Sequence, residues 1–170
     1  NHLSKPVIAL VQGAAFGGAV GLAACCDMVL ATEQSSFCLS EVKLGLIPAV
    51  ISPYVVRAIG ERQARRYFIS AEVFTARQAE HFGLVHEVCA DLEAMGRRCD
   101  DLLHQLSLNG PEAMKAAKAL VFAVSHKFIG TDVIDDTAQR IADIRVSAEG
   151  QEGLSAFLNK RKANWVPEEK

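Results

Sequence analysis

The sequence predicts an α/β fold that is followed by an all-helical segment. Between residues 7 and 90, short apolar runs typical of strands alternate with helical stretches, which is the pattern of layered α/β proteins. From residue 91 onward, apolar residues instead recur at helical spacing. A chain of 170 residues is long enough to bury a core. We therefore expect an α/β part over residues 1–90 and a helical part over residues 91–170.

The α/β part opens with an apolar strand at residues 7–11. Residues 12–16 are expected to form its exit loop, and residues 18–26 a helix whose Gly and Ala residues allow close packing. Further β-rich runs predict strands at residues 28–31, 37–39 and 84–88. The strongest helices of this part are expected at residues 61–70 and 75–82. Thr75 suits the N-cap of the second helix, and Gly83 suits its end.

The helical part contains three apolar stripes and a final helix. The stripes lie within residues 92–106, 114–124 and 133–144. Pro111 suits the first position of the second helix. The final helix is expected from Glu149, with the basic run 160–162 near its end, where positive charge complements the helix dipole. Amphipathic helices must bury their stripes, either on the core of the same chain or on another subunit.

Composition and charge argue against two classes of partner. The net charge is −2 and the basic residues are scattered apart from residues 160–162, so the chain has no electrostatic footprint for nucleic acid. Half of the residues are hydrophobic, yet no apolar run reaches the roughly 18 to 20 residues that span a bilayer. No secretory signal pattern opens the chain. We expect a soluble protein that binds neither nucleic acid nor membrane.

The cysteines and histidines indicate neither disulfides nor a metal site. The five cysteines lack C-x-x-C spacing and lie in apolar or helical settings, which is typical of reduced packing residues. The five histidines are dispersed along the chain, whereas a zinc site needs ligands at workable spacings. We therefore expect no metal and a reducing compartment.

Two features suit proton transfer beside a negatively charged oxygen. Gly17 and Gly18 stand between the first strand and the small-residue helix, so a peptide N–H near Gly18 would point out of a helix start, where an anion is favoured. Glu41 is a lone carboxyl in the mostly apolar run FCLSEVKLGLIP, where it can serve as an acid and a base. The residues alone leave plainer interpretations open, namely a tight turn at the glycines and a solvated surface charge at Glu41.

Five runs of residues match a family signature in order along the chain. They are KPVIALVQGAAFGGAVGLAACCDMVLAT, FCLSEVKLGLIP, AIGERQARRY, FTARQAEHFGLVHEV and EGQEGLSAFLNKRKANW. These runs resemble the crotonase (enoyl-CoA hydratase/isomerase) family. The resemblance implies that residues 1–90 form the C-terminal part of a ββα spiral core and residues 91–170 a helical trimerisation segment. It also implies a longer protein, because the chain starts at Asn1 without Met and earlier spiral turns supply a second oxyanion-hole N–H in that family.

The resemblance also implies roles for particular residues. The N–H of Gly18 would bind the thioester oxygen of an acyl-CoA substrate, and Glu41 would be the catalytic acid and base. The implied substrate-binding residues are Ala14, Phe16, Gly17, Gly21, Pro48 and Ala49. Coenzyme A is part of the substrate, so the resemblance implies no separate cofactor and no metal.

Gly21 is the main departure from the family pattern. Typical two-glutamate hydratases carry a Glu there, whereas this chain reads GGAVGL. The run CLSEVKLGLIPAVISPYVV is most similar to the bacterial 3-methylglutaconyl-CoA and isohexenylglutaconyl-CoA hydratases, which also lack that Glu. We therefore expect reversible hydration of a branched 2-enoyl-CoA, with Gly21 opening space for a substituent at C3. The run PAVISP at residues 48–53 either lines the acyl pocket or is a rigid connector into a helix expected at residues 54–59.

Two other functions stay open. A Δ3,Δ2-enoyl-CoA isomerase needs only one base, and a non-catalytic crotonase-fold binding or assembly protein would have lost its chemistry with the glutamate at position 21. The resemblance further implies a homotrimer or a dimer of trimers that assembles through the C-terminal helices. The expected compartment is the bacterial cytoplasm or, in a eukaryote, the mitochondrial matrix.

Overall fold

The chain falls into two compact units in the computed structural model, which describes residues 1–168. Unit 1 comprises Asn1 and residues 7–100, and unit 2 comprises residues 2–6 together with the chain from Asp101 onward. The division lies inside a helix, whereas the sequence-based division after residue 90 coincides with the loop before that helix. The last two residues of the expected helical part, 169 and 170, lie outside the described range.

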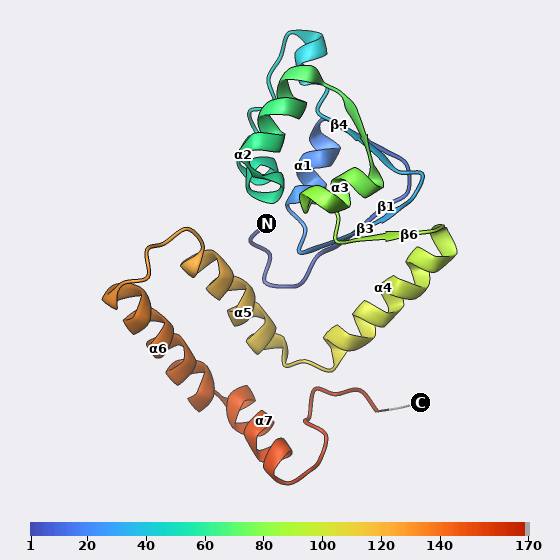
Figure 1. The fold of residues 1–170 in the computed structure, drawn as a ribbon. Coiled ribbons are helices and arrows are strands. Elements are labelled where there is room, and N and C mark those ends of the chain that lie inside the picture. The colour runs from blue at the N-terminus through green and yellow to red at the C-terminus, as the bar shows by residue number, and fades with distance from the viewer. Residues whose placement is uncertain (169–170) are drawn as a thin grey trace. The chain divides into compact units, whose positions relative to one another are not determined.

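Unit 1 is built on two small sheets (Figure 1). The first contains the parallel strands β1 (Ile8–Val11), β3 (Met28–Thr32) and β6 (Glu87–Cys89), in the order β1-β3-β6. The second contains β2 (Ala14–Phe16), β4 (Ser36–Cys38) and β5 (Val73–Thr75), in which β4 runs parallel to β2 and antiparallel to β5. Strands β1 to β4 therefore alternate between the two sheets, whereas β4 and β5 share the second sheet.

The strands and helices repeat as ββα turns. The first turn is β1, β2 and helix α1 (Gly18–Ala24), and the second is β3, β4, the 3-10 helix η1 (Glu41–Leu44) and helix α2 (Ser52–Ser70). Each turn lays one strand on each sheet, because Ile8 pairs with Met28 and Ala14 pairs with Ser36. This arrangement confirms the α/β class and is the spiral that the family resemblance implies.

The core of unit 1 is formed by the sheets and the helices that cover them. Phe37 of β4 stacks on Phe74 of β5 with ring centroids 5.6 Å apart, and Tyr67 of α2 contacts Phe74 at 4.6 Å. All three side chains are fully buried. Val20 and Ala23 of α1 belong to the same cluster, as the small-residue helix requires for close packing.

Four elements differ from the sequence-based expectation. Residues 14–16, expected in a loop, form strand β2, and β5 was not expected at all. Strand β6 begins at Glu87 rather than at residue 84. Helix α2 joins the two helices expected at 54–59 and 61–70 and begins at Ser52, with Gly60 at φ 77° and ψ 156° interrupting its helical geometry between them. Glycine adopts such a positive φ without the steric cost of a Cβ atom.

Helix α3 (Ala76–Phe82) begins and ends as the sequence predicts. The Thr75 side chain accepts a hydrogen bond from the N–H of Gln78 at 3.2 Å, and the Gln78 side chain accepts one from the N–H of Thr75 at 2.9 Å. This reciprocal pair is a capping box. Gly83 ends the helix in the left-handed conformation, with φ 86°.

Replacing Thr75 with alanine is expected to lower the free energy of unfolding by about 1 kcal/mol, because the first turn of α3 loses the acceptor of its cap. Urea denaturation of the full-length protein followed by circular dichroism measures this loss. Thr75→Ser keeps the hydroxyl and is the matched control. A Thr75→Ala protein as stable as Thr75→Ser would show that the cap contributes nothing.

Unit 2 is helical throughout its regular structure. It contains the end of α4 (Leu92–Ser107) followed by α5 (Pro111–Val124), α6 (Thr131–Val146) and α7 (Ala148–Leu158). These helices confirm the three apolar stripes and the final helix. The Glu149 carboxylate of α7 accepts hydrogen bonds from the N–H groups of Glu112 (2.9 Å) and Ala113 (2.7 Å), so it caps the start of α5. The basic run follows the end of α7, and its Arg161 pairs with Glu152 at 2.6 Å.

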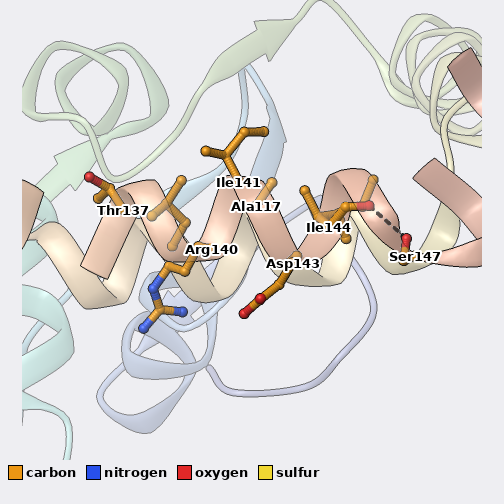
Figure 2. Close-up of a pocket in the computed structure, with 10 residues that line it drawn as sticks. Ala117, Thr137, Arg140, Ile141, Asp143, Ile144 and Ser147 are labelled. Carbon is orange, nitrogen blue, oxygen red and sulfur yellow. Dashed lines mark hydrogen bonds between the residues drawn. The ribbon is translucent and has the colours of Figure 1, made fainter. Parts of the chain in front are cut away.

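A groove of about 490 Å³ lies between α5 and α6 in unit 2. Its lining is mainly apolar, with Ala117 and Leu120 from α5 and Ile141 and Ile144 from α6. Figure 2 shows the charged Arg140 pointing away from Ile141 on the same helix. No helix within residues 1–168 is both long enough and apolar enough to span a membrane.

Candidate active site

Gly17 makes the sharp turn from β2 into α1. Its backbone has φ 54° and ψ −121°, a combination that residues other than glycine rarely adopt. Its N–H donates to the carbonyl of Cys38 in β4 at 2.8 Å, and its own carbonyl accepts from the N–H of Val20 at 3.0 Å. The turn is therefore held on one side by the neighbouring sheet and on the other by the first turn of α1.

Glu41 lies directly against this turn. It is the first residue of η1, two positions after the buried Leu39 that follows β4. A Cβ atom placed on Gly17 would be only 3.3 Å from Oε1 of Glu41 and 3.9 Å from Oγ of Ser40. Two sequence motifs that are 24 positions apart thus meet because β2 and β4 are paired neighbours. The sequence-based expectation that the glycine pair and Glu41 lie together agrees with this geometry.

The carboxyl of Glu41 has one oxygen without a protein partner. Oε2 is shielded from solvent, and among the residues that the structure describes it forms no hydrogen bond. Buried polar atoms in native proteins are nearly always hydrogen-bonded, so each exception calls for an explanation. An acid or base that exchanges a proton with a bound molecule has to keep a lone pair available in this way.

Gly18 occupies the first position of α1, directly after Gly17, whose Cβ position lies 3.3 Å from the Glu41 carboxyl. The N–H at this position has no acceptor inside the helix and lies at the positive end of the helix dipole. A Cβ atom on Gly18 would meet no atom of the described chain within 4 Å, so space is open around it. The arrangement brings the carboxyl of Glu41 to the residue that precedes this N–H donor at the helix start.

The space expected beside Gly21 is already filled. Gly21 is buried, and a Cβ atom placed on it would lie 2.1 Å from Cγ2 and 2.5 Å from Cβ of Ile51. The expectation that Gly21 opens room for a substrate substituent is therefore wrong, because Ile51 occupies the space directly beside Gly21. A side chain of the neighbouring loop, and not an empty hollow, takes the place of a side chain at position 21.

The other predicted binding residues are not all gathered at Glu41. Ala14 lines a hollow of about 420 Å³ on a face of α1 that carries Ala19 and Leu22, away from the face of Gly17 and Gly21. Phe16 is 45% exposed on β2. The remaining two residues belong to the loop after η1, where Pro48 is buried and Ala49 is exposed.

Ile51 enters the sequence-based prediction only as part of the run PAVISP, which either lines the acyl pocket or connects to a helix, and its contact with position 21 is not predicted. The sequence shows two separate departures from the family pattern, a glycine at position 21 and the bulky run PAVISP at 48–53. The missing side chain at position 21 and the added bulk of the run 48–53 together suggest that one fills the space left by the other. Only the structure shows that the two positions touch.

Two carboxyl groups of unit 1 have a pKa that is lowered by a surface ion pair. A hydrogen bond from Arg98 lowers the pKa of the Glu87 carboxyl, and one from Arg66 lowers the pKa of Glu72. These pairs join α4 to β6 and the end of α2 to the following loop. Within residues 1–168, no three His, Cys, Asp or Glu side chains come together as a metal site.

Comparisons with known proteins connect this geometry to one family. The family model described as "Enoyl-CoA hydratase/isomerase" matches residues 1–168. The chain is 36% identical over 160 residues to enoyl-CoA hydratase AKT6-1 of Alternaria alternata, covering 93% of this chain and 53% of that protein. It is 31% identical over 169 residues to mevalonyl-coenzyme A hydratase sidH of Aspergillus fumigatus, covering 96% of this chain and 61% of that protein.

A solved structure gives the same result for the fold. The crystal structure of an enoyl-CoA hydratase from Shewanella pealeana matches with a TM-score of 0.90 and 51% identity, covering 96% of this chain and 61% of that chain. The chain spans little more than half the length of these relatives.

Proposed function

Because this chain belongs to the enoyl-CoA hydratase/isomerase family and has its crotonase-type fold, we propose that the full-length protein is an enoyl-CoA hydratase. It adds water reversibly across the C2–C3 double bond of a 2-enoyl-CoA thioester. The observation that carries the proposal is the Glu41 carboxyl lying 3.3 Å from the Cβ position of Gly17, at the start of α1. An acid/base group and a backbone donor are the two parts that this reaction needs.

In the proposed mechanism, the thioester carbonyl is the electron sink. The N–H of Gly18 donates to the thioester oxygen, which gains negative charge as the water oxygen bonds to C3. Glu41 takes a proton from that water, and the same carboxyl returns a proton to C2, so that the thioester carbonyl is restored. The unpartnered Oε2 of Glu41 supports this double role. Coenzyme A belongs to the substrate, and the step needs no other cofactor.

We propose a branched acyl group of the methylglutaconyl type as the substrate. The run CLSEVKLGLIPAVISPYVV, which includes Glu41 and Ile51, supports this choice by its similarity to hydratases of such thioesters. The relative in Aspergillus fumigatus is named for a mevalonyl thioester, which also has a branch at C3. The substrate binds beside Glu41, and the loop after η1 carries the exposed apolar side chains of Leu46, Ile47 and Val50, which are available to contact an acyl group.

A Δ3,Δ2-enoyl-CoA isomerase is the second candidate. Position 21 holds no carboxyl, and Ile51 fills the space in which one would stand. A single base suffices to move a proton between two carbons, whereas hydration requires Glu41 to handle both water and C2. The site therefore also suits isomerisation.

An absorbance assay on the full-length protein separates the two candidates. The conjugated thioester absorbs in the ultraviolet, so a hydratase bleaches a 2-enoyl-CoA and an isomerase generates the chromophore from a 3-enoyl-CoA. We expect bleaching, with the highest kcat/KM for 2-enoyl thioesters that are branched at C3 rather than straight. Growth of absorbance from a 3-enoyl-CoA without any bleaching would overturn hydration in favour of isomerisation.

We also propose that the full-length protein assembles as a homotrimer or a dimer of trimers. Large apolar side chains of unit 2 are exposed in the single chain, among them Ile141 and Val146 of α6 and Phe157 and Leu158 of α7. Such side chains are normally covered by a partner. Light scattering of the purified protein gives the number of subunits. The proposed compartment is the cytoplasm or the mitochondrial matrix, in keeping with five cysteines that are all free thiols.

A further inference from the structure

We propose that Ile51 is a specificity-determining residue whose methyl group replaces a side chain at position 21 and forms an apolar wall beside Glu41. This inference rests on the proposed function, since it concerns the acyl group that reacts at Glu41. It assigns the hydrocarbon branch at C3 of the substrate to this wall, and it directs any charged arm of the acyl group away from it.

The packing of Ile51 on Gly21 leaves no room for even one more carbon atom. A Cβ atom on Gly21 would lie 2.1 Å from Cγ2, 2.5 Å from Cβ and 3.6 Å from Cα of Ile51. Carbon atoms that are not bonded approach to about 3.5 Å at the closest favourable distance. Rotation of the Ile51 side chain would move Cγ2 but not its Cβ atom, so the overlap persists in every rotamer.

The backbone of Ile51 cannot easily retreat. The carbonyl of Ile51 accepts hydrogen bonds from the N–H groups of Val55 (3.0 Å) and Tyr54 (3.1 Å) in the first turn of α2. The next residue, Ser52, donates its N–H to the carbonyl of Pro48 at 2.9 Å. The loop and the helix start thus hold Ile51 in place against α1.

The Ile51 methyl lies about one helical turn from the position that Glu41 covers. Gly17 is the N-cap residue of α1, and Gly21 lies four residues further along, a rise of about 6 Å or one helical turn. Glu41 covers the first of these positions and Ile51 covers the second. Because a helical Cα–Cβ bond tilts toward the N-terminus, the methyl that takes its place lies on the side of Gly21 that faces Glu41.

This neighbour determines what the acyl group can present to α1. Ile51 is half-buried, so part of its side chain remains available for contact with a ligand. A hydrocarbon branch gains from that contact, whereas a carboxylate pressed against it loses its hydration without a compensating partner. The wall therefore selects the orientation of a thioester that carries both an apolar branch and a charged arm.

A double-mutant cycle in the full-length protein tests the pairing. Gly21→Ala is expected to lower Tm by about 5 °C, because the added methyl overlaps Ile51. Ile51→Gly removes both overlapping atoms, Cβ and Cγ2, and leaves Cα at 3.6 Å, so the double variant Gly21→Ala/Ile51→Gly is expected to recover most of that loss relative to Ile51→Gly alone. Losses that simply add in the double variant would overturn the pairing. Gly96→Ala, a helical glycine whose Cβ position is open, is the matched control and should not lower Tm.

The substrate profile of Ile51→Ala tests the wall. We expect kcat/KM for a 2-enoyl-CoA with a long C3 branch to rise about 10-fold relative to the 3-methyl thioester, as the removed carbons leave room. An unchanged ratio in an enzyme that still bleaches both thioesters would overturn the inference while the proposed function stands. If the unaltered protein bleaches neither thioester, the proposed function fails, and the Tm cycle alone still decides whether the two residues are paired.

Discussion

Glu41→Gln is expected to lower kcat of the full-length protein about 100- to 10,000-fold, the range that general acid–base groups contribute. The amide has nearly the shape of the carboxyl but cannot take a proton from water. Binding of the thioester should therefore persist while turnover is lost. Bleaching of a 2-enoyl-CoA gives kcat, and calorimetric titration with a non-reacting saturated acyl-CoA gives the affinity.

The matched control for this variant is Glu61→Gln, which changes an exposed carboxyl on α2. It should keep the kcat of the unaltered protein. A Glu41→Gln protein with undiminished turnover would assign the acid/base role to another residue. If neither protein turns over any enoyl-CoA although both bind the saturated thioester, the non-catalytic alternative becomes the better description.

Gly17→Ala is expected to reduce kcat/KM about 100-fold, because a displacement of about 1 Å at a reacting group has an effect of this size. The backbone at this position has φ 54° and ψ −121°, which a Cβ atom disfavours. The added methyl would also lie 3.3 Å from Oε1 of Glu41. Relief of either conflict shifts the carboxyl, the start of α1 and the N–H of Gly18 relative to one another.

Thermal unfolding accompanies the kinetic measurement for this variant. Gly17→Ala should lower Tm, since strained backbone of this kind costs about 1–3 kcal/mol. Gly18→Ala is the matched comparison for Tm, because its Cβ position meets no atom within 4 Å and its φ is not positive. Equal values of Tm and kcat/KM for Gly17→Ala and the unaltered protein would show that this turn does not position the site.

The helices were predicted well because each carries its own signal. Helices α4, α5 and α6 are 14 to 16 residues long, so their apolar stripes repeat often enough to be recognised. The start of α3 was predicted for a different reason. A capping residue and a glycine stop are local features, and Thr75 and Gly83 act within the same few residues that contain them.

The short strands were harder to predict. Strands β2 and β5 have three residues each, which is too few for an alternating pattern to stand out. Their pairing with β4 comes from residues distant in sequence, and nothing in the run AAF requires it. Tertiary pairing therefore decided the structure of these segments, whose local sequence suits a loop equally well.

The candidate site likewise combines features with a sequence signal and features that only tertiary packing creates. Glycine and glutamate are common on surfaces, so the family motif, and not residue chemistry, brought Gly17 and Glu41 together in the prediction. The contact between Gly21 and Ile51 was missed because two residues 30 positions apart meet only once α1 and the start of α2 are packed together. A vacancy inferred from one glycine says little until the residue opposite it is known.

The pairing of β2 with β4 also fixes where the Gly17 turn and Glu41 lie relative to each other. Phe16, the last residue of β2, pairs with Cys38, the last residue of β4. The Gly17 turn and the segment that leads to Glu41 therefore start at the same end of the two paired strands. One residue inserted or deleted between Thr32 and Ser36 would shift the register of β4 against β2 by about 3.3 Å. The side chains of β4 would then point to the opposite faces of the sheet. Catalysis could thus be lost through a length change in a surface turn that touches no ligand.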